Sequence, residues 1–199
     1  MLYWITYGLD WIVMHLFSKT RVIGKENLRD GNTIYVCNHQ SAVDLFIMFL
    51  ILPHNTHFMA KKEFFAKKFV AWIMKKLQVF PVDRGKVDLV SLKHACGLLE
   101  EGKNLCIFPQ GTRKDHAKIE KEEMHNGVGM IALRKESAVV PMMFLTKPRL
   151  FHKNVLVIGS PMDLTAYRGQ RANSELLSQF SNELCEQMNA LLLPAVKES

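Results

Sequence analysis

A histidine and an aspartate at close spacing could carry acid–base chemistry. His39 and Asp44 lie in YVCNHQSAVDLF, residues 35–46, with His39 just after an expected strand and Asp44 in the first turns of the helix expected next. A carboxylate on one ring nitrogen would fix the tautomer and leave the other nitrogen free to take a proton. The chain has no G-x-S-x-G elbow and no Cys or Ser in a comparable setting. The pair therefore favours direct transfer of a group from one substrate to the hydroxyl of another, without an intermediate on the protein.

A second group of residues could hold an anion. In CIFPQGTRKD, residues 106–115, Gly111 would let the backbone approach a ligand, and Arg113 offers a planar fork that suits phosphate. A polar turn with a solvent-exposed arginine is the alternative. Arg84, in VFPVDRGK (79–86), follows another strand-like end. Taken alone, it is typical of a surface arginine.

These stretches lie in an alternating pattern of strands and helices. β-rich runs occupy 33–37, 56–60, 104–108, 138–145 and 154–159, and helical patterns occupy 42–52, 63–77, 87–101, 122–135 and 173–192. The alternation predicts a single α/β domain, residues 21–199, with a largely parallel mixed sheet flanked by helices. Ligands collect where the strands of such sheets end, and both candidate sites follow strand ends.

Residues 1–20 form a separate N-terminal segment, whose first part is largely apolar. On a helix, Trp4, Tyr7 and Trp11 share one face beside an aliphatic one. The segment lacks the features of a signal peptide, and it is short for crossing a bilayer and contains Asp10. We predict a helix that lies in the membrane surface, with a core-packed first helix as the alternative.

A second amphipathic stretch is KKEFFAKKFVAWIMKK, residues 61–76. At helical spacing, one face is basic and carries Lys67, Lys68 and Lys75. The opposite face is apolar and carries Phe65, Phe69, Trp72 and Ile73. Such a helix indicates either a membrane surface or the solvated face of an ordinary helix.

The composition limits the class of protein. With 48% hydrophobic residues the chain can bury a core, and a net charge of +7 favours anionic partners such as a phosphate compound or an acidic membrane. No nucleic-acid-binding motif is recognisable, so nucleic acid is not expected as a partner. The four cysteines show no C-x-x-C spacing, which predicts no disulfide framework and no zinc site and suits a reducing cytosol.

Four short blocks together resemble the glycerolipid acyltransferase family. NHQSAVD resembles the family's N-H-x4-D motif, FPVDRG its second block, FPQGTR its F-P-E-G-T-R block and VVPM its V-P block. They occur in the family's order over residues 38–142. The chain looks most similar to the bacterial 1-acylglycerol-3-phosphate (lysophosphatidic acid) acyltransferases.

The resemblance implies a reaction and roles for residues. His39 would be the general base on the acceptor hydroxyl, and Asp44 would orient it. The donor would be an acyl thioester of coenzyme A or acyl carrier protein, and the product phosphatidic acid, a phospholipid precursor. Neither a metal nor another cofactor is expected.

The resemblance also implies binding residues and a location. Arg84 and Arg113 would grip the acceptor phosphate, with Gly111 and Thr112 in the same loop. Lys61 would bind phosphate or stabilise the oxyanion of the tetrahedral intermediate. The family's N-terminal helices seat the active site against the bilayer, which implies a membrane-associated protein on the cytoplasmic face.

The sequence departs from the family pattern in two places. Gln110 stands where the family has glutamate, and His125 and Asn126 stand where a lysine often precedes a glycine. Gln110 would either anchor the loop through hydrogen bonds to backbone amides or, by removing a charge, leave an arginine freer for substrate. We expect an active enzyme. The alternatives are the same chemistry on another lysophospholipid or a phosphate-free lysolipid, and a membrane lipid-binding protein without turnover.

Overall fold

The computed structural model describes residues 19–83, 88–167 and 169–192. The N-terminal helix predicted for residues 1–17 and the predicted phosphate ligand Arg84 lie outside the described residues. No helix within the described ranges is long and apolar enough to cross a membrane.

The described strands form one seven-stranded mixed sheet in the order β1-β7-β6-β2-β5-β3-β4. The strands are β1 (Lys19–Ile23), β2 (Thr33–Cys37), β3 (Thr56–Lys61), β4 (Val79–Val82), β5 (Asn104–Ile107), β6 (Ala138–Phe144) and β7 (Lys153–Ile158). Neighbouring strands are parallel except β6 and β7, which are antiparallel. The predicted α/β class with a largely parallel mixed sheet is confirmed.

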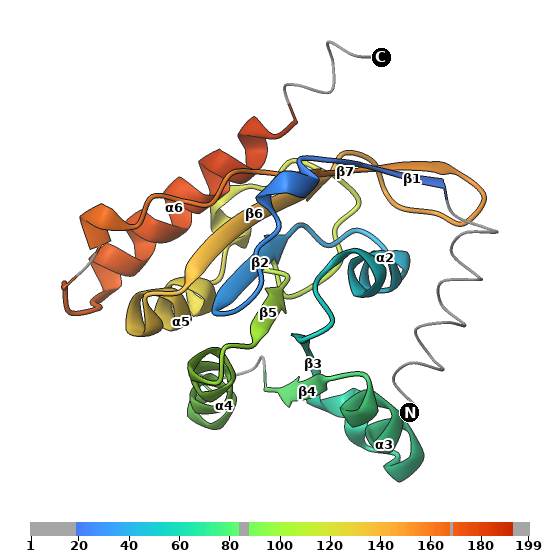
Figure 1. Ribbon diagram of the computed structural model, residues 1–199, viewed down its shortest axis with the longest axis horizontal. Coiled ribbons are helices and arrows are strands. Elements are labelled where there is room, and N and C mark those ends of the chain that lie inside the picture. Colours follow the sequence, from blue (N-terminus) through green and yellow to red (C-terminus); the bar gives the residue numbers. More distant parts are fainter. Residues whose placement is uncertain (1–18, 84–87, 168, 193–199) are drawn as a thin grey trace.

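Helices cover both faces of the sheet (Figure 1). The α-helices are α2 (Val43–Ile51), α3 (Lys68–Lys76), α4 (Leu89–Glu100), α5 (Gly127–Lys135) and α6 (Ser174–Ala190). The 3-10 helices are η1 (Lys25–Asn27), η2 (Lys62–Phe65), η3 (Lys121–Glu123) and η4 (Thr165–Tyr167). One face packs against α4, α5 and α6, and the other against α2 and α3.

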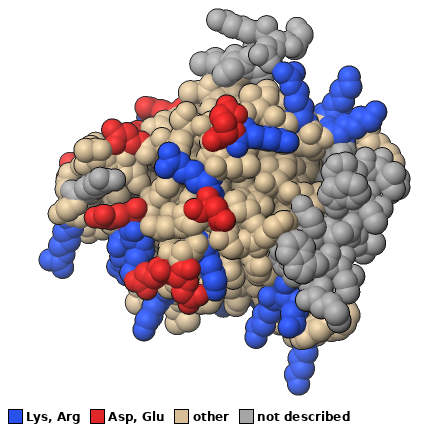
Figure 2. Space-filling view, viewed as in Figure 1, with Lys and Arg blue, Asp and Glu red and all other residues tan. Residues whose placement is uncertain are grey.

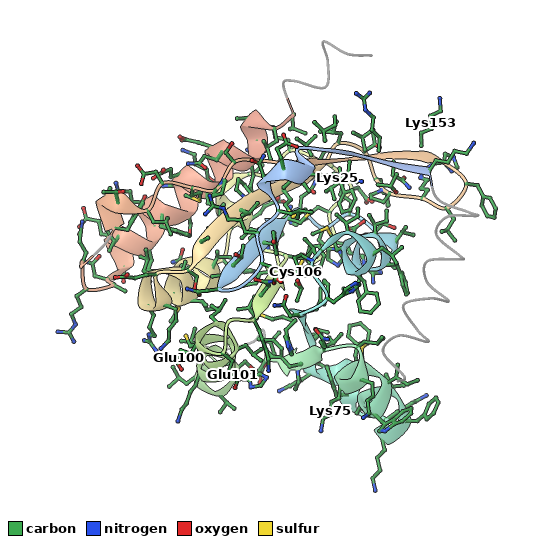
Figure 3. All side chains as sticks on the ribbon, viewed as in Figure 1. Lys25, Lys75, Glu100, Glu101, Cys106 and Lys153 are labelled. Atoms are coloured by element: carbon green, nitrogen blue, oxygen red, sulfur yellow. The ribbon has the colours of Figure 1, made fainter. Side chains whose placement is uncertain are left out.

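The core lies on both sides of β2. Ile34 and Val36 belong to the cluster shared with α4, α5 and α6, whereas Tyr35 and Cys37 belong to the one shared with α2. This alternation follows from the two-residue period of a strand, and burial on both faces is typical of parallel sheets. In Figure 3, Cys106 of β5 lies near the centre of the molecule and Lys153 of β7 at its outer edge.

The structure divides two predicted helices and adds one strand. The helical patterns at 63–77 and 122–135 each become a 3-10 turn followed by an α-helix, η2 with α3 and η3 with α5. In the first case Lys67 is extended, with φ −91° and ψ 122°, which interrupts the helix. The sequence analysis did not expect β1, whose KTRVI sequence lies at an edge of the sheet and stays partly exposed.

Parallel pairing brings the carboxyl ends of β2, β5, β3 and β4 to one edge of the sheet. Val36 pairs with Ile107, and Phe58 pairs with Cys106. The chain leaves the sheet at these ends, so the segments after the neighbouring strands β2 and β5, with His39 and Gln110, emerge side by side, and Lys61 ends β3 one strand farther on.

Candidate active site

Asp44 is buried in the first turn of α2, and three donors converge on its Oδ2 atom. The backbone amides of Gln40 and Ser41 donate to it at 2.6 and 2.9 Å, and Nδ1 of His39 lies 2.9 Å away. An ionised carboxylate only accepts hydrogen bonds, so Nδ1 carries the proton in the neutral imidazole. The predicted His39–Asp44 contact is present, and it fixes the tautomer of the ring.

The His39 ring is held on its other side by an aromatic ring. Phe108 stacks on it with ring centroids 4.3 Å apart and an interplanar angle of 21°. The His39 side chain is 14% exposed, and Nε2 has no hydrogen-bond partner among the described residues. Since Nδ1 is occupied, Nε2 is the ring atom that can take a proton from a bound substrate.

No described side chain is placed as a nucleophile for His39. Neither a hydroxyl nor a thiol of the described residues is hydrogen-bonded to its ring. The nearby thiols of Cys37 and Cys106 are buried, and burial raises the pKa of both, so they stay protonated. The arrangement is compatible with a base that acts directly on a substrate, which stays a prediction.

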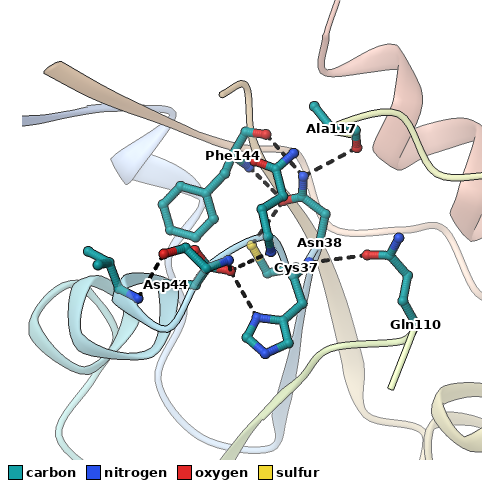
Figure 4. A network of polar contacts seen from close by, with 10 residues as sticks. Cys37, Asn38, Asp44, Gln110, Ala117 and Phe144 are labelled. Carbon is teal, nitrogen blue, oxygen red and sulfur yellow. Dashed lines mark hydrogen bonds and ion pairs between the residues drawn. The ribbon is translucent and has the colours of Figure 1, made fainter. Parts of the chain in front are cut away.

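Asn38 ties the histidine segment to the core, a role that the sequence analysis missed. Its Nδ2 donates to the carbonyl oxygens of Phe144 and Ala117 at 3.0 and 3.3 Å, and its Oδ1 accepts from the Phe144 amide at 2.8 Å. Figure 4 shows Asn38 between these two residues, beside Cys37. Asn38 is fully buried. A polar residue directly after an apolar strand was the available signal.

Gln110 is 3% exposed and bonded at both ends of its amide. Oε1 accepts from the backbone amide of His39 at 3.1 Å, and Nε2 donates to Oε2 of Glu123 at 2.9 Å. Figure 4 shows Gln110 pointing towards the histidine segment from the β5 side. Of the two interpretations of Gln110, this arrangement corresponds to the loop anchor. Glu123 lies in a run of charged residues, and nothing in the sequence distinguishes it.

The loop after β5 makes a tight turn before reaching its exposed residues. Gly111 has φ 66°, a conformation that suits glycine, and its amide donates to the Phe108 carbonyl at 3.1 Å. Lys114 donates its backbone amide to the His39 carbonyl at 2.8 Å. Thr112 and Arg113 between them are exposed, and no hydrogen bond or ion pair of the Arg113 guanidinium forms within the described part of the chain.

The other predicted binding residues lie farther from the base. Lys61 ends β3, two strands away from β2, and its side chain is 52% exposed with Nζ 3.5 Å from Oε1 of Glu63. Hydrogen bonds therefore connect His39 to both Asp44 and Gln110, whereas Lys61 lies apart from them at the carboxyl end of β3.

A cavity of about 410 Å³ lies beside Phe108. Apolar side chains supply most of its lining, among them Met59, Leu92, Phe108, Val128 and Ile131. His125 and Asn126, which replace the expected lysine, also line it. An apolar cavity that shares Phe108 with the histidine could hold a hydrocarbon chain next to the base.

His39, whose Nε2 has no partner among the described residues, thus lies at the carboxyl ends of a mostly parallel sheet, where such folds bind their ligands. The acyltransferase family model matches residues 19–145, more than half of the chain. The chain belongs to the acyltransferase family and is an O-acyltransferase, as the sequence blocks predicted.

Two named relatives and one solved structure support this family assignment. The 1-acyl-sn-glycerol-3-phosphate acyltransferase of Bacillus subtilis is 32% identical over 193 residues, which cover 90% of this chain and 95% of that protein. A chloroplastic enzyme of the same name from Arabidopsis thaliana is 30% identical over 162 residues, 74% of this chain and 44% of that one. The crystal structure of the 1-acyl-sn-glycerophosphate acyltransferase of Thermotoga maritima matches with a TM-score of 0.65 at 27% identity, over 87% of this chain and 71% of that one.

Proposed function

We propose that this enzyme transfers an acyl group from a thioester of coenzyme A or acyl carrier protein to the free hydroxyl of 1-acylglycerol-3-phosphate, giving phosphatidic acid. The observation that carries the proposal is the His39–Asp44 pair, 2.9 Å apart, with Nε2 open and no protein nucleophile beside it among the described residues. The names of the relatives support the acceptor.

In the proposed reaction, Nε2 of His39 takes the proton of the acceptor hydroxyl as its oxygen attacks the thioester carbonyl carbon. The carbonyl oxygen becomes an oxyanion in a tetrahedral intermediate. Collapse of the intermediate reforms the carbonyl and breaks the C–S bond, and the thiolate takes the proton back from the imidazolium. Asp44 stabilises the imidazolium through Nδ1. The acyl thioester is the only co-substrate, and neither a metal nor a cofactor takes part.

The acceptor phosphate is proposed to bind at Arg113 and Arg84, because a guanidinium can hold phosphate through two parallel hydrogen bonds. The exposed Arg113 guanidinium, unbonded within the described residues, is available for this role. Lys61, at the rim of the same edge, is proposed to bind phosphate or the oxyanion. The apolar cavity beside Phe108 is proposed to hold an acyl chain.

The test is acyl transfer by purified protein, followed by mass spectrometry of the lipid products. Each acyl donor is offered with lysophosphatidic acid. We expect His39→Ala to lower turnover by at least about 100-fold, the ordinary contribution of a positioned base. His152→Ala, at an exposed histidine before β7, is the matched control and is expected to behave as wild type. Equal activity of wild type and His39→Ala would refute the base.

Another lysophospholipid is a second candidate acceptor. The observation behind it is that Asn126 and His125 line the cavity where the family often has a lysine. A mixture of lysophospholipids and a phosphate-free lysolipid, offered in one assay, ranks the acceptors. Preference for the phosphate-free lipid would refute phosphate binding at Arg113.

We also propose that the enzyme works at an anionic membrane surface on the cytoplasmic side. Phe64, Phe69 and Trp72 of η2 and α3 are 53%, 71% and 50% exposed. Phe69 and Trp72 stack with centroids 6.3 Å apart. Aromatic rings exposed together are costly in water and favour the boundary between lipid and water.

Lysines surround these rings. Lys67, Lys68, Lys75 and Lys76 are exposed on or next to α3, and in Figure 2 basic side chains gather where Figure 1 shows α3. Lys75 projects from the surface of this helix in Figure 3. The sequence analysis put Phe65 on the same face as Phe69, but Phe65 packs against the core. Cations beside exposed aromatic rings fit anionic headgroups.

Co-sedimentation with vesicles tests this surface. The double change Phe69→Ala and Trp72→Ala should weaken binding to vesicles of phosphatidylglycerol and phosphatidylcholine by at least about 10-fold, because each ring loses its burial in lipid. Phe151→Ala, at an exposed phenylalanine outside this surface, is the control. Unchanged binding of the double variant would refute the assignment.

A further inference from the structure

A glutamine–glutamate pair joins three separate segments around the base. Gln110, after β5, accepts a hydrogen bond from the His39 backbone amide at 3.1 Å and donates one to Oε2 of Glu123, in η3, at 2.9 Å. The backbone reinforces the junction, since Lys114 donates to the His39 carbonyl and His125 donates to the Pro109 carbonyl. The Gln110 side-chain amide thus holds the backbone of the segment that carries the base.

The chemistry of the neighbours fixes the orientation of this amide. A backbone N–H only donates, so the atom that faces His39 must be the Gln110 oxygen. An ionised carboxylate only accepts, so the atom that faces Glu123 must be the Gln110 nitrogen. Each end of the amide therefore depends on the other, and an acceptor at position 123 holds the oxygen towards His39.

Glu123 is kept ionised by its surroundings. Its Oε1 lies 2.7 Å from Nζ of Lys114 and 3.5 Å from Nε2 of His116, and its side chain is 13% exposed. Burial alone would raise the pKa of the Glu123 carboxyl, but hydrogen bonds from Lys114 and Gln110 outweigh it and lower the pKa below its ordinary value. Its contribution to stability is therefore present above the unfolded pKa and is lost as the pH falls through the lower, folded one.

We propose that Gln110 and Glu123 are positioning residues that act as one unit, and that this unit accommodates one carboxylate but not two. The inference deepens the proposed function and rests on it, because the unit acts through the backbone of His39. It places the negative charge at residue 123, two hydrogen bonds away from the His39 backbone, so that position 110 must be neutral while residue 123 is ionised.

The single change Gln110→Glu should therefore be harmful. It keeps an acceptor for the His39 amide, but it sets a second carboxylate against Glu123 at the distance of a hydrogen bond, without a donor between them. We expect kcat/KM to fall by about 10- to 100-fold, the effect of one lost hydrogen bond in a buried charged setting. Glu123→Gln, which keeps an acceptor oxygen, should cost only about 3-fold.

The reciprocal double variant, Gln110→Glu with Glu123→Gln, is the decisive test. The carboxylate introduced at position 110 would accept from the His39 amide and from the new amide at position 123, whose oxygen would face Lys114. We expect kcat/KM to return to within about 5-fold of wild type, whereas independent effects would multiply. Glu122→Gln, which removes an exposed carboxylate from the same 3-10 helix, is the matched control and should act as wild type.

The pH dependence of activity distinguishes charge repulsion from a loss of packing, because a loss of packing would lower the activity equally at each pH. In Gln110→Glu the two carboxylates repel each other, which raises one pKa, and a shared proton would restore the missing donor. The activity of this variant relative to wild type should rise as the pH falls from about 8 to about 6. The titratable groups that contact Glu123 among the described residues, Lys114 and His116, are the same in both proteins.

The outcomes separate this inference from the proposed function. If His39→Ala is inactive but the double variant is no better than Gln110→Glu, or Gln110→Glu is as active as wild type, the inference is overturned and the proposed function stands. If wild type makes no phosphatidic acid, the proposed function fails. The unit is then judged by thermal unfolding, where the double variant should regain the midpoint lost in Gln110→Glu, and a failure to regain it overturns the inference.

Discussion

The segments that follow β2 and β5 leave neighbouring parallel strands at the same edge, yet they are held very differently. After β2, Asp44 is buried, the His39 ring is 14% exposed, and three donors meet on one carboxylate oxygen. After β5, only the base of the loop is fixed, by Gln110 and Gly111, and Thr112 and Arg113 are exposed. The first segment is fixed by the fold itself, whereas the second leaves two side chains exposed.

The difference fits the roles proposed for the two segments. A base must face its proton within hydrogen-bond reach, so the energy of orienting it is best supplied by the fold. A phosphate ligand needs charge and access, and its partners arrive with the substrate. Substitutions in the first segment should therefore lower kcat, and those in the second should raise KM.

The largest expected effect is on the fixed segment. Asp44→Asn keeps an oxygen for the backbone amides but removes the charge that stabilises the imidazolium. We expect kcat to fall by about 100-fold with little change in KM, measured by steady-state kinetics. Asp163→Asn, at an exposed carboxylate bonded to Thr165, is the control. An unchanged kcat would remove the distinction between the two segments.

The next effect is on the exposed segment. Arg113→Ala should raise KM for lysophosphatidic acid by about 30-fold and change kcat by less than about 3-fold, because a charge-assisted pair to phosphate is lost in binding. Arg113→Lys should raise KM by an intermediate amount, since lysine keeps the charge but cannot form the two parallel hydrogen bonds of a guanidinium. Arg134→Ala, at an exposed arginine of α5, is the matched control. A lower kcat at unchanged KM would mean that this loop takes part in the chemistry.

The smallest effect on catalysis is expected for Asn38, which connects the segment after β2 to the core. Asn38→Ala leaves the buried amide and carbonyl of Phe144 without their side-chain partners. It should lower the free energy of unfolding by about 2 kcal/mol, with kcat within about 5-fold of wild type. Asn173→Ala, which removes the cap of α6, should cost about 1 kcal/mol. Chemical denaturation measures both, and equal losses would show that Asn38 is no special anchor.

The alternation of strands and helices was enough to predict the fold, because the apolar runs that became β2, β5 and β6 are buried on both faces. The edge strand β1 escaped prediction since its polar, partly exposed residues lack such a run. The two divided helices were predicted as single ones because their apolar spacing continues across an interruption that only the backbone reveals.

The contact between His39 and Asp44 was predicted because chemistry and spacing coincide there within a few residues. Other contacts were missed where they join distant parts of the chain. Glu123 reaches Gln110 across 13 positions, and Asn38 reaches Phe144 across 106. Tertiary packing decides which distant residues meet, so a single sequence can mark Asn38 as a polar residue after an apolar strand but cannot name its partner.

The stacking of Phe108 on His39 has an electrostatic consequence. An aromatic face is the negative side of its quadrupole, and it attracts a cation within about 6 Å. The ring centroids are 4.3 Å apart, so the imidazolium formed between the two proton transfers would lie against that face. In the proposed reaction, the Phe108 ring would therefore attract the transient imidazolium from one side while the Asp44 carboxylate attracts it from another.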